Sequence, residues 1–163
     1  AWLATFGGGL NKLTYSQKDR NSYKFFAYRH NPQNPNSISD DRVYTLLNDS
    51  NGNFWIGTQA GLCSFNPKTG TFKHIRQPRD INLGLGTTAK IHEDASGNLW
   101  LVTRNGFLVQ FKPDTYETEF YPLNYPINYP RSTLESRIQF FTINKKLFGD
   151  SLLSLVFRCT IPG

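Results

Sequence analysis

Three tyrosines of this 163-residue sequence recur at intervals of four residues, and a proline follows each of them. Proline restricts the backbone to extended conformations, so this segment is predicted to be a stiff loop that carries aromatic rings. Aromatic faces stack on sugar rings, and arginines pair with acidic substituents through parallel hydrogen bonds. The alternative is that the tyrosines pack the loop onto its neighbour. The candidate ligand-binding residues are Arg29, Arg79, Arg104, Tyr121, Tyr125, Tyr129 and Arg131.

Other residue types that support chemistry do not form a recognisable site in the sequence. His30, His74 and His92 fall in a linker, an outer strand and an inner strand of the expected elements, which argues against a shared metal site. The pairs Asp40-Asp41 and Glu93-Asp94 are adjacent on expected strands, where neighbouring side chains point to opposite faces and cannot share acid–base work. The sequence also lacks a nucleophile elbow, a phosphate-binding loop and a zinc-protease motif. We therefore predict no catalytic residue, no metal and no cofactor for this segment.

The composition limits the class of protein further. The net charge is +6, but among the basic residues only Lys145 and Lys146 are adjacent, which argues against a nucleic-acid partner. The longest apolar runs are too short to cross a bilayer, so no direct membrane insertion is expected. Cys63 and Cys159 lie far apart and are predicted to be free thiols. Because the sequence contains no Met and starts without a secretory signal, we expect a processed product or a piece of a longer chain.

An internal repeat is the strongest signal in the sequence. Trp2, Trp55 and Trp100 each begin a Trp-aliphatic-small-Thr pattern, at spacings of 53 and 45 residues (55 − 2 and 100 − 55). The pattern Asp-x-x-Gly-Asn-apolar-Trp leads into the second and third copies, beginning at Asp49 and Asp94. An aspartate at the start of a turn accepts hydrogen bonds from the backbone ahead of it, and the glycine supplies a left-handed conformation. Both aspartates are therefore predicted to form hairpin turns.

Each repeat is predicted to contain four short antiparallel strands. A second turn and a Gly-Leu strand follow each Trp strand, and an outer aromatic strand comes after a third turn. Four strands in each repeat of roughly 40 to 50 residues are typical of a β-propeller blade. A β-sandwich with long hairpins is the alternative, but the strands of a sandwich need not repeat in sequence. The predicted fold class is all-β, with propeller blades of four antiparallel strands.

The repeats resemble a known family, the two-component regulator propeller repeat. The resemblance rests on Asp49 to Phe65 and Asp94 to Phe111, on Trp2 to Leu13 as a third copy, and on the Asn-Pro-Asn-Ser link within Tyr28 to Ser39. It implies the periplasmic sensor of a bacterial hybrid two-component protein, attached to the inner membrane and followed by a β-sandwich, a membrane helix, a histidine kinase and a response regulator. It also implies ligands derived from complex polysaccharides.

The length allows about three to three and a half blades, whereas closed propellers usually need four to eight. We therefore expect an incomplete arc of a larger propeller, whose open edges are covered by the remaining blades of a parent chain or by a second copy, with a homodimer as one possibility. Since the sequence begins at a Trp strand, the first blade is expected to lack its innermost strand. The expected segments are 1–41 (partial first blade and linker), 42–86 (second blade), 87–135 (third blade and linker) and 136–163 (degenerate or partial fourth blade).

Strand order predicts which end of the blades binds a ligand. In each blade the Asp-Gly-Asn turn and the third turn share one end, while the second turn and the crossover to the next blade share the other. This second end carries the long connections 29–41, 77–86 and 122–133, together with the turns that begin at Phe6, Gln59 and Arg104. Long loops on a rigid scaffold are where binding residues concentrate. We expect an oligosaccharide-sensing, non-enzymatic segment; the alternatives are a carbohydrate-active lyase or hydrolase and a protein-interaction scaffold.

Overall fold

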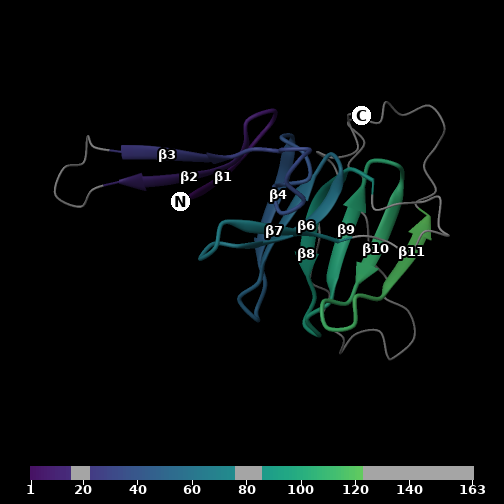
Figure 1. Ribbon diagram of the computed structural model, residues 1–163. Helices are drawn as coiled ribbons and strands as arrows, with labels where there is room; N and C mark the ends of the chain where they lie inside the picture. Colours follow the sequence, from purple (N-terminus) through teal and green to yellow (C-terminus); the bar gives the residue numbers. More distant parts are fainter. Residues whose placement is uncertain (16–22, 76–85, 123–163) are drawn as a thin grey trace, which may run out of the picture. The chain divides into compact units, whose positions relative to one another are not determined.

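The computed structural model describes residues 1–15, 23–75 and 86–122, which belong to a compact unit spanning Ala1–Leu123. The second unit, Asn124–Gly163, lies outside the described residues. The described part of the chain contains no helix and eleven strands (Figure 1). The strands are β1 (Trp2–Thr5), β2 (Gly9–Tyr15), β3 (Tyr23–Tyr28), β4 (Val43–Asn48), β5 (Phe54–Thr58), β6 (Gly61–Asn66), β7 (Thr71–His74), β8 (Thr88–Glu93), β9 (Leu99–Thr103), β10 (Phe107–Phe111) and β11 (Thr118–Pro122).

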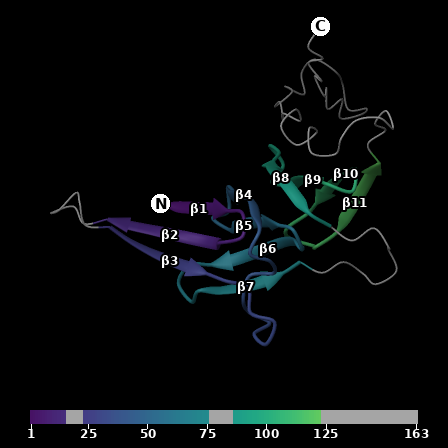
Figure 2. The ribbon, with the colours of Figure 1, turned by 90° about the horizontal axis from the view of Figure 1, so that it is seen from above.

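The strands form three separate antiparallel sheets. The first sheet has the order β1-β2-β3, and Figure 2 shows these strands side by side. The second and third sheets have four strands each, in the orders β4-β5-β6-β7 and β8-β9-β10-β11. Neighbouring strands in each sheet are consecutive in sequence, as a meander requires. The predicted all-β class with four-stranded antiparallel blades is confirmed. The residue bounds expected for the four segments stay predictions, and segment 136–163 lies outside the described residues.

The Asp-x-x-Gly-Asn turns form as the sequence predicts, and each aspartate also binds the tryptophan of its own repeat. Asp49 Oδ1 accepts the backbone N–H groups of Asn51 and Asn53, at 3.1 and 2.7 Å. Its Oδ2 accepts the indole N–H of Trp55 at 2.7 Å. Gly52 has a φ of 81°, a left-handed conformation that favours glycine. The turn therefore orients the buried indole as well as reversing the chain.

The third sheet repeats this arrangement with the same geometry. Asp94 accepts the backbone N–H groups of Ser96 and Asn98, at 2.8 and 3.0 Å. The indole N–H of Trp100 donates to Asp94 Oδ2 at 2.9 Å. One short sequence pattern therefore builds the same turn twice, which explains why the pattern recurs in register.

The two turn aspartates are expected to make the stability of the fold depend on pH. Burial raises the pKa of Asp49, but hydrogen bonds from Trp55, Asn53 and Asn51 outweigh it, so the pKa lies below its ordinary value of 3.8. The pKa of Asp94 is lowered by the same kind of contacts against the same effect of burial. A carboxyl group with a lowered folded-state pKa contributes stability that is complete above the unfolded pKa and is lost as the pH falls through the folded pKa.

Urea unfolding measured at a series of pH values checks this expectation. The free energy of unfolding should decline as the pH falls below about 4. In the Asp49→Ala variant the decline should be shallower, because one of the carboxyl groups with a lowered pKa no longer titrates. If the free energy of unfolding falls equally steeply with pH in the two proteins, Asp49 is not a source of the acid sensitivity.

Two hydrophobic cores lie between successive sheets, and a tryptophan enters each of them. Trp2 contacts the rings of Phe54 and Phe65 on the second sheet, at centroid distances of 5.5 and 5.2 Å. Trp55 contacts Phe111 on the third sheet at 5.5 Å. Burying one such aromatic side chain contributes about 2 to 3 kcal/mol. The cores are Leu10, Ile38, Val43, Phe54, Ile56, Cys63, Phe65 and Phe72 between the first two sheets, and Trp55, Leu62, Ile75, Leu99, Leu101, Val109 and Phe111 between the second and third.

Polar contacts also join the second and third sheets. The carboxylate of Glu93 on β8 accepts two hydrogen bonds from Ser50. One comes from the backbone N–H, at 2.8 Å, and the other from the Ser50 hydroxyl. The two sheets also come close at the other end of β8. A Cβ added to Gly57 of β5 would lie 2.5 Å from the carbonyl oxygen of Thr88 of β8. Glycine in the Trp-Ile-Gly-Thr motif therefore permits the close approach of β5 and β8.

The link between the first and second sheets is bound along its length to the second sheet. Ser37 and Ile38 are buried, and Phe72 N donates to the carbonyl oxygen of Asn36 at 2.8 Å. A ring nitrogen of His74 lies 2.7 Å from the carbonyl oxygen of Ser37. These bonds hold residues 36 and 37 of the link against β7.

Candidate functional site

The turns after β1, β5 and β9 are each closed by the motif threonine. Thr5 Oγ1 donates to Gly9 O at 2.7 Å, and Thr58 Oγ1 donates to Gly61 O at 3.0 Å. Thr103 Oγ1 donates to Phe107 O, also at 3.0 Å. Because the threonine hydroxyl closes each turn, the side chain that follows it is not needed to hold the turn. That side chain differs among the three sheets: it is Phe6, Gln59 or Arg104.

These three side chains meet at Tyr44, which a β-bulge presents to them. Val43 pairs with Thr58 and Thr45 pairs with Gly57, so the register of β4 shifts at Tyr44. A bulge of this kind bends the strand and changes the direction of a side chain, and bulges are frequent next to functional sites.

Tyr44 contacts one side chain from each of the three turns. Its hydroxyl donates to Gln59 Oε1 at 2.6 Å and accepts from Arg104 Nη1 at 3.0 Å. The guanidinium carbon of Arg104 lies 5.5 Å from the centre of the Tyr44 ring. Phe6 contacts the same ring edge-on, at a centroid distance of 5.8 Å. We call these four residues, Phe6, Tyr44, Gln59 and Arg104, the Tyr44 cluster.

The Tyr44 cluster combines an open aromatic surface with oriented polar groups. Phe6 is 74% exposed, whereas Tyr44, Gln59 and Arg104 are half-buried. An exposed aromatic ring gains by covering its face with another apolar surface, such as the face of a sugar ring. The adjacent amide and guanidinium supply acceptor and donor groups, and a guanidinium suits a carboxylate or sulfate. The cluster is therefore chemically suited to a polyhydroxylated ligand, including an acidic one.

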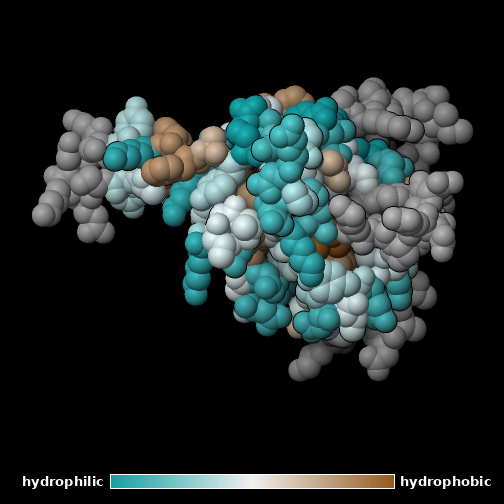
Figure 3. Space-filling model, in the orientation of Figure 1, coloured by the Kyte–Doolittle hydropathy of each residue, from teal (hydrophilic) through white to brown (hydrophobic). Residues whose placement is uncertain are grey.

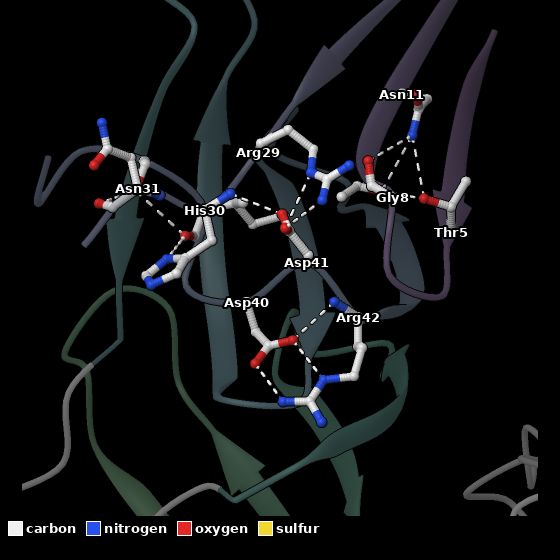
Figure 4. Close-up of polar contacts among 12 residues, drawn as sticks. Thr5, Gly8, Asn11, Arg29, His30, Asn31, Asp40, Asp41 and Arg42 are labelled. Atoms are coloured by element: carbon white, nitrogen blue, oxygen red, sulfur yellow. Dashed lines mark hydrogen bonds and ion pairs between the residues drawn. The ribbon is translucent and has the colours of Figure 1, made fainter. Parts of the chain in front are cut away.

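Two ion pairs occupy the adjacent aspartates Asp40 and Asp41 (Figure 4). Arg42, of one pair, forms a β-bridge with Phe6 of the Tyr44 cluster. Arg29 pairs with Asp41 at 2.8 Å, and Arg42 pairs with Asp40 at 2.8 Å. A hydrogen bond from Arg42 lowers the pKa of Asp40. Burial raises the pKa of Asp41, but the backbone N–H of His30 and the Arg29 side chain lower it by more. Both carboxylates are therefore held in their charged forms.

The structure places Asp40 and Asp41 in the link before β4, within the connection expected over residues 29–41 and not on a strand as the carboxylate-pair argument assumed. Each carboxylate bonds to a different arginine: Asp41 to Arg29, and Asp40 to Arg42. Glu93, of the second pair, does lie on a strand and binds Ser50.

The structure separates the predicted ligand-binding residues. Arg104 lies in the Tyr44 cluster, and Arg29 lies at the same end, where the carbonyl of its partner Asp41 accepts the N–H groups of Gly7 and Gly9. Tyr121 lies on the outer strand β11, where its ring contacts Trp100 at 5.8 Å and its hydroxyl donates to Glu119 at 2.6 Å. The contact with Trp100 favours a packing role for Tyr121. Arg79, Tyr125, Tyr129 and Arg131 lie outside the described residues.

Sequence reasoning missed Phe6, Tyr44 and Gln59 as site residues. Phe6 and Gln59 begin turns that were assigned to the binding end, but their convergence on one side chain depends on contacts between repeats. A usable signal was present: the position after the motif threonine holds a different residue type in each copy. Tyr44 had no such signal, because a bulge does not follow from strand patterning.

The histidines and the described cysteine have structural partners. A ring nitrogen of His30 lies 2.7 Å from the carbonyl oxygen of Ile38, close to the corresponding contact of His74 with Ser37. Within residues 1–15, 23–75 and 86–122, no three His, Cys, Asp or Glu side chains are grouped as metal ligands. Cys63 is a free thiol, as expected, and burial raises its pKa; Cys159 lies outside the described residues. No helix long and apolar enough to span a membrane occurs in the part of the chain that the structure describes.

Comparison with solved structures finds the same fold in extracellular domains from B. thetaiotaomicron. A domain assigned to a hybrid two component system superposes with a TM-score of 0.60 at 23% identity, over 74% of this chain and 16% of the other. A domain assigned to a one component system gives a TM-score of 0.54 at 26% identity, over 73% and 15%. A second structure of that same domain, there assigned to a hybrid two component system, gives 0.58 at 23% identity, over 76% and 16%.

Comparison of sequences points in the same direction. Residues 37–60 match the family described as two component regulator propeller. A protein named histidine kinase P4, from Formosa agariphila, is 32% identical over 88 residues, which are 51% of this chain and 6% of that protein. The chain thus spans only a small part of the length of each relative. The resemblance inferred from the Trp and Asp-Gly-Asn motifs is confirmed: residues 37–60 match a two component regulator propeller repeat, and the described strands share the fold of these extracellular domains.

Proposed function

We propose that this segment senses an oligosaccharide released from a complex polysaccharide, and that the Tyr44 cluster is part of the binding site. The observation that carries the proposal is the convergence of one variable turn residue from each of three sheets on Tyr44. Constant scaffolds with variable, clustered loop residues are typical of binding sites. The exposed ring of Phe6 suits the face of a sugar, and Arg104 suits an acidic substituent.

In this proposal the segment is the periplasmic part of a larger sensor anchored in the inner membrane, with a histidine kinase elsewhere in the parent chain. Support comes from relatives that are extracellular domains of two component systems and from one that is named a histidine kinase. Ligand binding would signal by favouring one arrangement of the sensor over another. This shift requires that the ligand bind the two arrangements with different affinities.

An enzymatic function is the second candidate, and five of the described carboxylates give it little support because they already have other partners. Asp40 and Asp41 are ion-paired, Asp49 and Asp94 hold turns, and Glu93 binds Ser50. A glycosidase needs two carboxyl groups that flank a sugar bond and are available to it. A scaffold that binds other proteins is the third candidate, and no contact among the described residues favours it specifically.

Calorimetry on the complete extracellular region, with oligosaccharides from neutral and acidic polysaccharides, tests the proposal. Arg104→Ala is expected to weaken binding of the acidic ligand by about tenfold to a hundredfold, since a charged hydrogen bond contributes about 1.5 to 3 kcal/mol. Phe6→Ala is expected to weaken the binding of acidic and neutral ligands alike. The matched control is Lys112→Ala, which removes an exposed ion pair with Glu117 at the opposite end of the third sheet.

Two outcomes would contradict the proposal. Unchanged affinity in both Arg104→Ala and Phe6→Ala would remove the Tyr44 cluster from the binding site. Release of shortened products from the oligosaccharides by the purified protein would favour an enzyme over a sensor. Chromatography of the ligand after incubation distinguishes consumption from binding.

A further inference from the structure

Two asparagine–glycine pairs occur in the sequence, Asn51-Gly52 and Asn105-Gly106. In such a pair the backbone nitrogen of the glycine can attack the side-chain carbonyl carbon of the asparagine. A C–N bond forms, ammonia leaves, and water opens the resulting cyclic succinimide to give aspartate or isoaspartate. Glycine favours the reaction because it has no Cβ to hinder the approach of its nitrogen. Each pair is therefore a candidate site of chemical modification.

The pair Asn51-Gly52 lies at the tip of the turn that Asp49 holds. Both residues are exposed, and Figure 3 shows a hydrophilic surface where the turn between β4 and β5 lies in Figure 1. Apart from its chain neighbours, no described atom lies within 4 Å of the place that a Cβ on Gly52 would take. Among the described residues, the Asn51 side-chain amide has no hydrogen-bond partner, whereas that of Asn53 donates to Asp49 at 2.8 Å. The Asn51 side chain can therefore turn toward the Gly52 nitrogen without losing a hydrogen bond.

The second pair and the third-sheet turn are less suited to the reaction. A Cβ on Gly86 would lie 3.2 Å from Asn105 Oδ1, so the Asn105 side chain packs beside that backbone, and Gly106 is half-buried. In the Asp-x-x-Gly-Asn turn of the third sheet, Ser96 stands at the position of Asn51, and serine has no amide to lose. Of the two equivalent turns, only that of the second sheet therefore carries the reactive pair.

The hydrogen bonds of the turn control how fast the pair reacts. The backbone nitrogen of Gly52 donates to Asp49 O at 3.0 Å, so this N–H must be released before the nitrogen can attack. Release requires the turn to open, and exposed turns open more readily than the strands of a core. The Asp49 carboxylate opposes opening, because it accepts the N–H groups of Asn51 and Asn53. The reaction is therefore slow in the folded protein and proceeds from the open turn.

We propose that Asn51 is a site of spontaneous deamidation, whose products loosen the contact between the second and third sheets as the protein ages. Either product adds a negative charge to a turn that already bears Asp49 and binds the Glu93 carboxylate through Ser50. Isoaspartate also adds a carbon to the main chain, within the span that the Asp49 bonds hold. The bond from Trp55 to Asp49 and the bonds from Ser50 to Glu93 both depend on this turn. The proposal does not depend on the identity of the ligand.

Peptide mapping by mass spectrometry of the complete extracellular region, incubated at neutral and at alkaline pH, tests the proposal. Trypsin releases residues 43–68 as one peptide, in which fragmentation distinguishes Asn51 from the neighbouring asparagines. The expected result is that Asn51 loses its amide several-fold faster than Asn105. The loss should be faster at alkaline pH, because the attacking nitrogen must give up its proton. The Tm of the incubated protein should fall as the modified fraction rises.

Exchange of residues between the two equivalent turns supplies matched variants. Asn51→Ser gives the second sheet the residue of the third, and it is expected to abolish the reaction there and to preserve Tm during incubation. Ser96→Asn gives the third sheet an asparagine–glycine pair in the same kind of turn, and it is expected to create a second reactive site. Asn51→Asp adds the charge without lengthening the main chain, so it is expected to lower Tm by less than complete conversion of the wild-type protein does.

Two results would overturn the proposal. Retention of the Asn51 amide under conditions in which Asn105 is converted would show that exposure and an unbonded side chain do not select the site. An equal fall of Tm in the incubated wild-type and Asn51→Ser proteins would show that modification of Asn51 does not loosen the turn. Neither readout involves the ligand, so failure of the oligosaccharide proposal would leave this test unaffected.

Discussion

Replacing Asp49 with alanine is expected to lower the free energy of unfolding by about 3 kcal/mol. The substitution removes the acceptor of the Trp55 indole N–H, and Trp55 is 2% exposed, so water cannot replace the lost bond. It also removes the acceptor of two backbone N–H groups, those of Asn51 and Asn53. A buried donor without a partner costs about 1 to 3 kcal/mol, and here one donor is fully buried and two are partly so.

Urea unfolding followed by tryptophan fluorescence measures this effect and reports on the indole directly. The control is Asp114→Ala, which alters an exposed aspartate in the turn between β10 and β11. That control is expected to change stability by less than about 0.5 kcal/mol, as surface substitutions usually do. A similar small change in Asp49→Ala would mean that the bond to the indole contributes little.

Replacing Gly57 with valine is expected to destabilise the protein by about 3 kcal/mol or more. A Cβ at this position would lie 2.5 Å from the carbonyl oxygen of Thr88 and 2.5 Å from the Cγ2 of Thr45. The Thr88 oxygen belongs to the backbone of β8, so relieving the overlap requires moving one sheet away from the other. The second core, which lies between these sheets, would lose contacts as a result.

The matched control for Gly57 is the same motif position in the first sheet. Ala4 is exposed, and Ala4→Val is expected to change the free energy of unfolding by less than about 0.5 kcal/mol. Calorimetric Tm values of the two variants, measured side by side, check the contrast. Equal Tm values would show that the sheets adjust to a side chain at position 57 and that the glycine is not required for their approach.

Much of the fold follows from the sequence because the signals are local to one repeat. The spacing of Asp49 and Gly52 predicts a turn, and the structure forms it with hydrogen bonds that span four residues. The alternation after Trp55 predicts the strands, and each sheet is built from consecutive strands. Interactions of this range depend only on neighbouring residues, so one sequence is enough to predict them.

The site was predicted only in part because its contacts cross between repeats. Arg104 was named from its residue type, but its partner Tyr44 lies 60 residues away in the chain. The bulge that reorients Tyr44 depends on how β4 pairs with β5, and the pattern of apolar residues does not encode that shift. Likewise, the Asp-Gly-Asn motif predicted a turn, but the bond from Asp49 to Trp55 needed the three-dimensional packing of the indole.

The threonine-closed turns have a consequence for how such a protein changes over generations. Thr5, Thr58 and Thr103 each secure a turn without help from the next side chain. Duplication or exchange of one repeat would therefore replace a single lining residue while leaving the strands intact. Ligand specificity can then change by one residue for each repeat that is exchanged, with little loss of folding stability at any step.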